Sequence, residues 1–168
     1  YKLADWGSLP YRSASRGSAV FGERAGVLSK LASRSRESDV PRIFIVTQRM
    51  LVSPQVPPAY IRGLSFVLRK GQDLAPDALA AQLATRGYLR VPRVSMKGEF
   101  ALRGEVLDVY MPGEENAHRI LFDFDQIGQI KTFDTETQST KETISELLVY
   151  PMKEVIWTEE LCRRSEER

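Results

Sequence analysis

The chain has 168 residues, of which 42% are hydrophobic and 27% are charged, and its formal net charge is +2 at pH 7. This length and composition suit one good core or two modest ones and exclude a disordered or fibrous protein. A single cysteine excludes an intrachain disulfide and fits a reducing cytoplasm, and a single histidine excludes an ordinary Cys/His zinc cluster. No run approaches about 18 apolar residues and no leader pattern opens the chain, so we expect neither a membrane span nor secretion.

The net charge hides an asymmetry between the two ends of the chain. Residues 1–70 carry 12 Lys and Arg against 4 Asp and Glu, whereas residues 105–168 carry 7 against 15. Because basic residues gain affinity by releasing counterions from phosphates, a nucleic-acid-binding module is one interpretation of the basic half. An ordinary solvated surface is the other, because five of these arginines lie among serines and glycines without an aromatic stacking array beside them: Arg12, Arg16, Arg34, Arg36 and Arg42.

The first block of the chain has the pattern of an incomplete α/β unit. Residues 23–32 predict a short helix with three apolar residues on one face: Val27, Leu28 and Leu31. The apolar run 43–46 is typical of a strand buried on both faces of a parallel sheet, and Thr47 can cap a helix after it. The proline-rich stretch 54–58 lacks backbone donors that helices and sheets need, so we place a domain boundary near it.

The second block opens with the clearest helix signal of the chain. Pro76 suits a first helical position, and Leu79 and Leu83 lie one turn apart on one face. Arg86 suits the last turn, and Gly87 suits the left-handed position that follows a helix. We therefore predict one main helix in this block.

Short strands are predicted around this helix, at 65–68, 119–124 and 127–133. In the second of them three apolar residues alternate toward a core: Ile120, Phe122 and Phe124. Asp125 and Gly128 suit the tight connection to the next strand. The pattern predicts a largely antiparallel α+β module over residues 63–151, attached to a partial α/β domain over residues 1–62.

The segment 98–110 carries the most distinctive pattern. Apolar residues alternate along it, but the phase of the alternation changes at Gly104: Phe100 and Leu102 stand before it, Leu107 and Val109 after it. A change of phase at a glycine predicts one long strand with a β-bulge, which bends the strand and re-aims the neighbouring Arg103.

Three separated motifs, at residues 87–91, 98–110 and 133–139, resemble the UvrB-homology module. That module occurs in the nucleotide-excision-repair helicase UvrB and in the bacterial transcription-repair coupling factors, and residues 119–130 resemble its next hairpin. Residues 5–11, followed by Glu23 and Arg24, are more similar to the coupling factors than to UvrB. Two positions of the hairpin depart from the family pattern: Phe124 replaces a usual glycine and Gln126 a usual glutamate.

The resemblance implies that residues 63–151 dock UvrA, the damage-sensing ATPase. Arg90 and Arg103 match family positions that carry much of this contact, and Tyr110 stands where the family usually has phenylalanine. Residues 1–62 would belong to a degenerate, helicase-like α/β domain, and residues 152–168 would start the return to it or a linker helix.

The resemblance also implies the role of this piece within a longer protein. Because the chain opens on a residue other than methionine and closes on a charged run, we interpret it as a fragment. The complete protein would be a cytoplasmic, bacterial DNA translocase that uses ATP and Mg²⁺ and has RNA polymerase and double-stranded DNA as partners. The fragment itself would be a non-catalytic adaptor without a cofactor.

Three alternatives to the hypothesis stay open, one for the two arginines and two for the whole chain. Arg90 and Arg103 suit an interface because arginine presents a planar fork of donors to carboxylates. They also suit plain surface ion pairs with nearby acidic residues: Glu99, Glu105 or Asp108. At the level of the whole chain, the rivals are a nucleic-acid-binding module and a fragment of the UvrB helicase.

Catalytic and metal sites have little support in the sequence. No P-loop pattern occurs, so we expect no ATP hydrolysis in this piece. Two acidic pairs have the residue types of acid–base or cation sites, but they lie at expected turns, where Asp is common: Asp123 with Asp125, and Asp134 with Glu136. His118 follows a polar turn without a partner that would make it a base. We predict no catalytic, cofactor or metal site.

Overall fold

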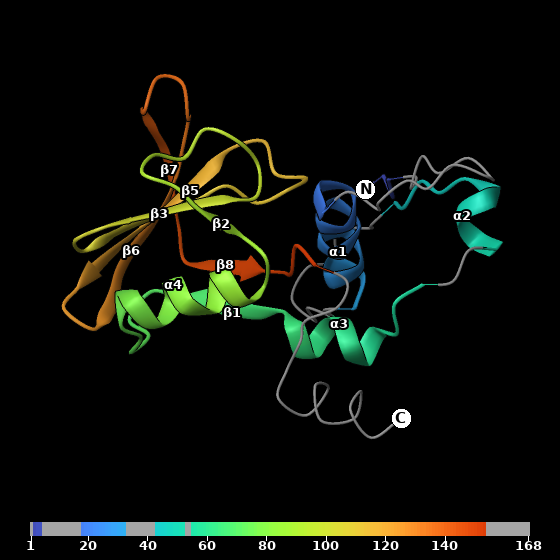
Figure 1. Ribbon diagram of the computed structural model, residues 1–168, viewed down its shortest axis with the longest axis horizontal. Coiled ribbons are helices and arrows are strands. Elements are labelled where there is room, and N and C mark those ends of the chain that lie inside the picture. Colours follow the sequence, from blue (N-terminus) through green and yellow to red (C-terminus); the bar gives the residue numbers. More distant parts are fainter. Residues whose placement is uncertain (1, 5–17, 33–42, 53–54, 154–168) are drawn as a thin grey trace.

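The structure, a computed structural model, describes residues 2–4, 18–32, 43–52 and 55–153. Its helices are α1 (Ser18–Ala32), α2 (Gln48–Val52), α3 (Pro58–Leu64) and α4 (Pro76–Thr85). Its strands are β1 (Phe66–Arg69), β2 (Leu89–Arg90), β3 (Glu99–Arg103), β4 (Val106–Val109), β5 (Ala117–Asp123), β6 (Gln126–Phe133), β7 (Thr140–Ile144) and β8 (Glu146–Val149). The strands and α4 gather on one side, and α1, α2 and α3 lie on the other (Figure 1).

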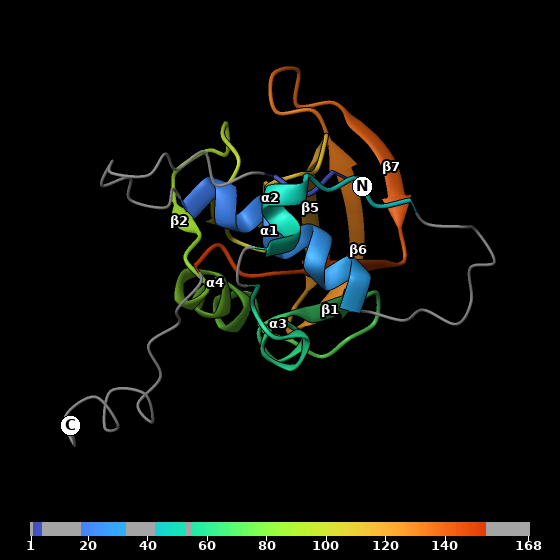
Figure 2. The same ribbon diagram turned by 90° about the vertical axis from the view of Figure 1, so that its right-hand side faces the viewer.

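The strands form a six-stranded sheet in the order β2-β3-β4-β5-β6-β7 and a separate antiparallel pair of β1 and β8. Every neighbouring pair of the larger sheet is antiparallel except β2 and β3. Seen from the side, α1 and α2 lie in front of this sheet and β7 forms one of its edges (Figure 2). The predicted α+β class with a largely antiparallel sheet is confirmed, and of the helices described none has the length and apolarity to cross a membrane.

The main helix, α4, agrees with its sequence signals. It begins at Pro76, and Leu79 and Leu83 are fully buried. Arg86 follows the helix and donates from its guanidinium to the carbonyl oxygen of Gln82 at 3.1 Å. Gly87 has a φ of +94°, so it occupies the left-handed position as predicted. The predicted strands at 65–68, 119–124 and 127–133 correspond to β1, β5 and β6.

One hydrophobic core joins α4 to the sheet and continues into the N-terminal helices. It includes Leu79 and Leu83 of α4 and, from the strands that α4 covers, residues such as Phe100 and Leu107. The same core contains buried residues of α1 and α3: Phe21, Ala25 and Ile61. The domain boundary between residues 62 and 63 stays a prediction, and the described core runs across it.

The segment 98–110 is a hairpin and not the single bulged strand that was predicted. β3 ends at Arg103, which pairs with Val106 of β4, so Gly104 and Glu105 form a two-residue turn. Gly104 has a φ of +59°, and a glycine at the first central position is what a type II′ hairpin turn requires. The change of phase therefore reflects a reversal of the chain. Arg103 is the last residue of β3, and no bulge re-aims it.

The most buried face of α1 is not the face that carries the three predicted apolar residues. Phe21 and Ala25 are buried, and a Cβ on Gly26 would lie 2.7 Å from the ring of Tyr150. The small residues on this face let α1 approach the rest of the fold closely. This face of the helix therefore points toward the core, and the more apolar face does not. The three residues of the predicted apolar face are half-buried or exposed, although Leu28 packs against the core: Val27, Leu28 and Leu31.

Residues 43–46 do not form the predicted buried strand. Ile45 makes a single parallel bridge with Lys2. A buried parallel strand needs neighbours on both edges and cover on both faces, and the described residues supply this one bridge. Three side chains of the run are consequently exposed: Ile43 by 74%, Ile45 by 63% and Val46 by 38%. α2 follows Thr47 as predicted, and the carbonyl of Thr47 accepts from Met50 N at 3.0 Å.

The connection between β5 and β6 lies earlier than predicted. Asp123 pairs with Gln126, so Phe124 and Asp125 form the turn. Phe124 does not face the core, because the chain reverses at this residue, which has a φ of +54° and is 80% exposed. Gly128 belongs to β6 and not to the turn.

Candidate protein-docking face

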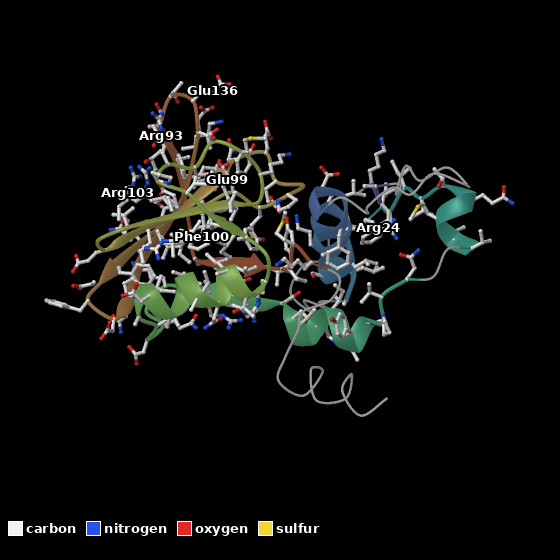
Figure 3. The ribbon with its side chains drawn as sticks, in the orientation of Figure 1. Arg24, Arg93, Glu99, Phe100, Arg103 and Glu136 are labelled. Carbon is white, nitrogen blue, oxygen red and sulfur yellow. The ribbon has the colours of Figure 1, made fainter. Side chains whose placement is uncertain are left out.

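The six-stranded sheet has one face toward α4 and an opposite face, which we call the outer face. Directly opposite residues of paired strands share a face. The register Ala101–Asp108–Arg119–Lys131 therefore places these four side chains on one face, with Arg103 two residues beyond Ala101. Figure 3 shows Arg103 on this outer face and Phe100 between β3 and α4.

Asp108 is the centre of an ion-pair cluster on the outer face. It is 2% exposed, although it lies on the face away from α4. Its Oδ1 accepts from Arg119 Nε at 2.7 Å, and its Oδ2 accepts from an Nη2 atom of Arg119 at 2.9 Å and of Arg103 at 2.8 Å. We call these three residues the arginine–aspartate cluster. It holds two guanidinium groups on one buried carboxylate, so its net charge is positive.

Arg119 is the more enclosed arginine of the cluster. Its side chain is 20% exposed, and its guanidinium carbon lies 4.5 Å from the centroid of the Phe133 ring. Arg119 also donates to Gln138 Oε1 at 3.1 Å, which ties the β6–β7 connection to the cluster. The hydrogen bond to Asp108 raises the pKa of Arg119, burial lowers it, and the charge of Asp108 raises it further. These contacts on both sides fix the plane of the Arg119 guanidinium.

Arg103 is the exposed arginine of the cluster. Its side chain is 50% exposed and bonds Asp108 through Nη2. The surface ion pair considered from the sequence therefore exists for Arg103, with Asp108 as the partner. Because a guanidinium has five donors in a rigid fork, this bond leaves further donors directed at solvent. Arg103 is thus held in place and still able to bind a carboxylate from another molecule.

Tyr110 lies on the same face as the cluster, because it follows Asp108 by two residues. Its hydroxyl donates to the carbonyl of Glu115 at 3.0 Å, and Lys97 Nζ lies 5.8 Å from its ring centroid. Burial raises the pKa of Tyr110, and the nearby carboxylates of Asp134 and Glu115 raise it further. The structure therefore brings Tyr110 and Arg103 together on one face.

Arg90 does not share that face. β2 pairs with β3 in parallel, with Leu89 beside Glu99 and Arg90 beside Phe100. The pleat therefore puts Arg90 on the side of Phe100, whereas Leu89 shares the side of Glu99 and Arg103. Both residues of this two-residue edge strand are exposed. Arg90 lies at the rim of the sheet, and Arg103 and Tyr110 are the predicted residues that the outer face carries.

Sequence reasoning missed two features of the face. Arg119 was not singled out, because its contact with Asp108 follows from the register of β4 and β5 and not from a local motif. Glu99 Oε2 accepts from Ser95 N at 2.9 Å and from Met96 N at 2.8 Å, which holds the loop between β2 and β3. Burial raises the pKa of Glu99, but these bonds outweigh it and the net shift is downward. Arg93 belongs to the same loop and is exposed (Figure 3).

Asp134 of the second acidic pair is held by backbone hydrogen bonds, and the single histidine, His118, is buried. Asp134 Oδ1 accepts from the backbone nitrogens of Glu136 at 2.9 Å and of Thr137 at 3.0 Å, and these bonds lower the pKa of Asp134. His118 is buried with its Nδ1 unpaired, and burial lowers the pKa of this imidazole. Within the described ranges no group of three or more His, Cys, Asp or Glu side chains is arranged to hold a metal ion.

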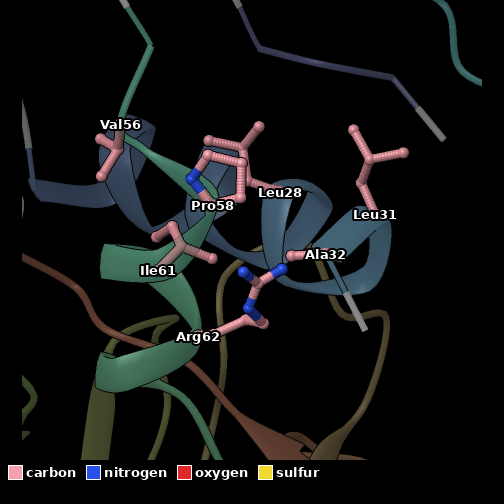
Figure 4. A pocket seen from close by; sticks show the side chains of 7 residues that line it. All are labelled: Leu28, Leu31, Ala32, Val56, Pro58, Ile61 and Arg62. Atoms are coloured by element: carbon pink, nitrogen blue, oxygen red, sulfur yellow. The ribbon is translucent and has the colours of Figure 1, made fainter. Parts of the chain in front are cut away.

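A separate apolar pocket of about 240 Å³ lies between α1 and α3 (Figure 4). Leu28, Val56 and Ile61 line it, and Arg62 is its charged member. None of the residues of the outer face reaches it. The pocket therefore belongs to the N-terminal helices and is a separate feature from the candidate face.

The fold and the outer face define a small α+β module with a cationic cluster on its free sheet surface. The family described as the UvrB interaction domain matches residues 66–155, more than half of the chain. The chain belongs to the UvrB interaction domain family. The domain that defines this family is a non-catalytic module.

Relatives of two kinds are similar to the chain. It is 34% identical to the transcription-repair-coupling factor of Escherichia coli over 90% of this chain and 13% of that protein. It is also 34% identical to the transcription-repair-coupling factor of Myxococcus xanthus over 94% of this chain and 13% of that protein. It is 34% identical to UvrABC system protein B of Pseudothermotoga lettingae over 66% of this chain and 17% of that protein. The chain thus spans between an eighth and a fifth of the length of these relatives.

Proposed function

We propose that this chain is the N-terminal UvrB-like region of a bacterial transcription-repair coupling factor. In this role it recruits UvrA to DNA lesions at which RNA polymerase has stalled. The alignments with coupling factors extend over 90% and 94% of the chain, whereas the alignment with UvrABC system protein B covers 66%. This difference supports a coupling factor over a fragment of the UvrB helicase.

The arginine–aspartate cluster is the observation that carries the docking proposal. Arg103 offers unused donors while Asp108 and Arg119 hold its position, so little conformational entropy is lost on binding. Arginines held in this way are frequent anchors of interfaces, and truncating an anchor costs about 2 kcal/mol or more, which is about 30-fold in Kd. The complementary surface of UvrA would present carboxylates to the cluster.

The other residues of the proposed site surround this anchor. Tyr110 would extend the contact along β4, since it shares the outer face with the cluster. Arg90 would contribute from the rim of the sheet, where it is exposed on β2. We propose Arg103 as the principal contact and Tyr110 and Arg90 as flanking contacts.

The docking step as proposed uses no cofactor. ATP, Mg²⁺, RNA polymerase and double-stranded DNA would be ligands and partners of the longer protein, whose site of action is the bacterial cytoplasm. A nucleic-acid role for the basic half of the chain receives no support from the geometry, because its five prominent arginines lie outside the described residues. A steep decrease of duplex DNA binding with salt concentration would support that rival role.

Calorimetric titration of the chain with purified UvrA tests the proposal. We expect Arg103→Ala to weaken binding about 30-fold while the far-UV circular dichroism stays unchanged. Arg69→Ala is the matched control, because Arg69 is also an exposed arginine with an ion pair, at 3.5 Å to Glu146, but lies on β1. Binding of Arg103→Ala with the affinity of the wild type would contradict the proposed site.

A further inference from the structure

The turn between β5 and β6 exposes an aromatic side chain that nothing in the fold requires. Phe124 is 80% exposed, and its backbone has a φ of +54°. A bulky residue in this left-handed conformation is a strained outlier, and strained residues concentrate at functional sites. A glycine would meet the demands of the turn without strain. The phenylalanine therefore costs stability, and its ring contributes little to the core.

Four exposed carboxylates lie at the same end of the sheet as this ring. Asp123 and Asp125 flank it in sequence, and Gln126 Nε2 donates to Asp73 Oδ1 at 3.1 Å, which brings in a third carboxylate. The backbone of Glu105 also lies at this end of the sheet, because its carbonyl accepts from Phe122 N at 2.8 Å. None of the four carboxylates forms an ion pair with any described residue. Together they make an acidic rim around one aromatic side chain.

An exposed cation, Lys70, partly offsets the rim. Lys70 reaches the same end of the sheet, because the next residue, Gly71, donates from its backbone nitrogen to Ile127 at 2.7 Å. Arg69, the residue before Lys70, is paired with Glu146 at 3.5 Å, so the four carboxylates without an ion pair leave the surroundings of Phe124 acidic. Such a surface repels phosphates, so a nucleic acid stacking on the ring is disfavoured. A partner of complementary chemistry is a protein surface with an apolar pocket and basic side chains around it.

The acidic rim lies close to the arginine–aspartate cluster. Arg103 pairs with Val106, which pairs with Leu121, and Phe124 follows Leu121 by three residues. Two strand spacings and three residue rises place Phe124 about 14 Å from Arg103. An interface of about 800 Å² per partner spans about twice that distance. The β3–β4 and β5–β6 turns lie at the same end of the sheet, away from α1 and α2 (Figure 1).

We infer that Phe124 is a second anchor of the same docking interface and enters a basic-rimmed apolar pocket on UvrA. This inference rests on the proposed function. The interface then has two parts of opposite charge: the cationic cluster at Arg103 faces carboxylates of the partner, and the acidic turn at Phe124 faces its basic residues. This alternation would fix the orientation in which the module docks, because a reversed orientation would place like charges together.

Phe124→Gly is an unusually clean test of this inference. Glycine adopts a positive φ without strain, so the variant should fold with a melting temperature equal to or above that of the wild type. We expect its affinity for purified UvrA to fall about 10-fold or more, as for the loss of an aromatic anchor. Leu51→Ala is the matched control, because Leu51 is 71% exposed on α2, and its truncation should leave the affinity unchanged.

A charge variant tests the acidic rim separately. Asp123→Asn combined with Asp125→Asn keeps the size of both side chains and removes two negative charges. We expect weaker binding to UvrA and a smaller loss of affinity between 50 and about 200 mM salt than in the wild type. An unchanged dependence on salt would overturn the proposed basic rim of the partner pocket.

The outcomes distinguish this inference from the proposed function. If Arg103→Ala weakens binding and Phe124→Gly does not, the second anchor is overturned and the proposed function stands. If Phe124→Gly weakens binding and Arg103→Ala does not, the second anchor stands and the role of Arg103 is overturned. If the wild-type chain binds no UvrA, the proposed function fails and this inference fails with it.

Discussion

Asp108→Asn should destabilise the fold far more than Arg103→Ala, although both changes break the same ion pair. Asparagine keeps the shape of Asp108 but removes its charge, and its amide NH₂ would face the donors of Arg119. The buried carboxylate accepts three charge-assisted hydrogen bonds in the native state, at 2.7, 2.8 and 2.9 Å. Each such bond is worth about 1.5–3 kcal/mol, and they are not additive.

The expected magnitude follows from the exposure of each partner. Removing one member of a buried pair costs about 3–5 kcal/mol. Arg103 is half exposed and Arg119 is 20% exposed, so water compensates part of that cost. We expect Asp108→Asn to cost about 2–4 kcal/mol, which lowers the melting temperature by about 5–12 °C for a chain of this size. Arg103→Ala loses a solvent-screened pair and should cost about 1 kcal/mol or less.

Thermal and urea unfolding followed by circular dichroism measure both costs. Asp123→Asn is the control, since Asp123 is exposed without an ion pair to any described residue, and its change should stay within about 0.5 kcal/mol. Equal losses of stability for Asp108→Asn and Arg103→Ala would refute the view that Asp108 and Arg119 form the structural base of the cluster. A loss below about 1 kcal/mol for Asp108→Asn would refute it as well.

Three further predictions concern packing, a turn and pH. Gly26→Ala should destabilise the chain by about 1–3 kcal/mol in urea unfolding, because the new Cβ would lie 2.7 Å from the buried ring of Tyr150. Gly63→Ala, with nothing within 4 Å, should instead be neutral or stabilising, and a loss there would contradict the packing account. Gly104→Ala should cost about 1 kcal/mol, since its φ is +59° and the site is otherwise open. Burial lowers the pKa of His118 below 6.5, so the unfolded chain takes up this proton first and stability falls as the pH drops below about 6.5. A His118→Gln variant with the same loss of melting temperature between pH 7.5 and 5.5 would contradict this assignment.

Local signals account for the parts of the fold that could be predicted. The sequence of the helix that begins at Pro76 carries a favourable first residue, a buried stripe at Leu79 and Leu83, and a glycine after its end. Each of these signals acts within a few residues. The hairpin at Gly104 was misread because the phase change at a glycine fits a bulge and a turn equally well. What separates the two is whether Arg103 pairs with Val106 across the turn, and the alternation of apolar residues does not state that pairing.

Long-range contacts account for the parts that could not be predicted. Asp108 and Arg119 are directly opposite because of the register between β4 and β5, and no local pattern states that register. Arg90 and Arg103 were grouped by sequence similarity, but the parallel pairing of β2 places Arg90 beside Phe100. The resemblance to the family supplied the residues of the predicted site, and the sheet decides which of them share a face.

Site-specific photo-crosslinking to UvrA tests the central claim, that the partner binds the outer face of the sheet, most directly. A photoreactive amino acid in place of Arg93 would stand on the exposed loop between β2 and β3, the strand that ends at Arg103 (Figure 3). The same group in place of Arg62, an exposed residue of α3, is the control. We predict a crosslinked product with UvrA from position 93 and none from position 62. Crosslinking from position 62 without crosslinking from position 93 would contradict docking through the outer face.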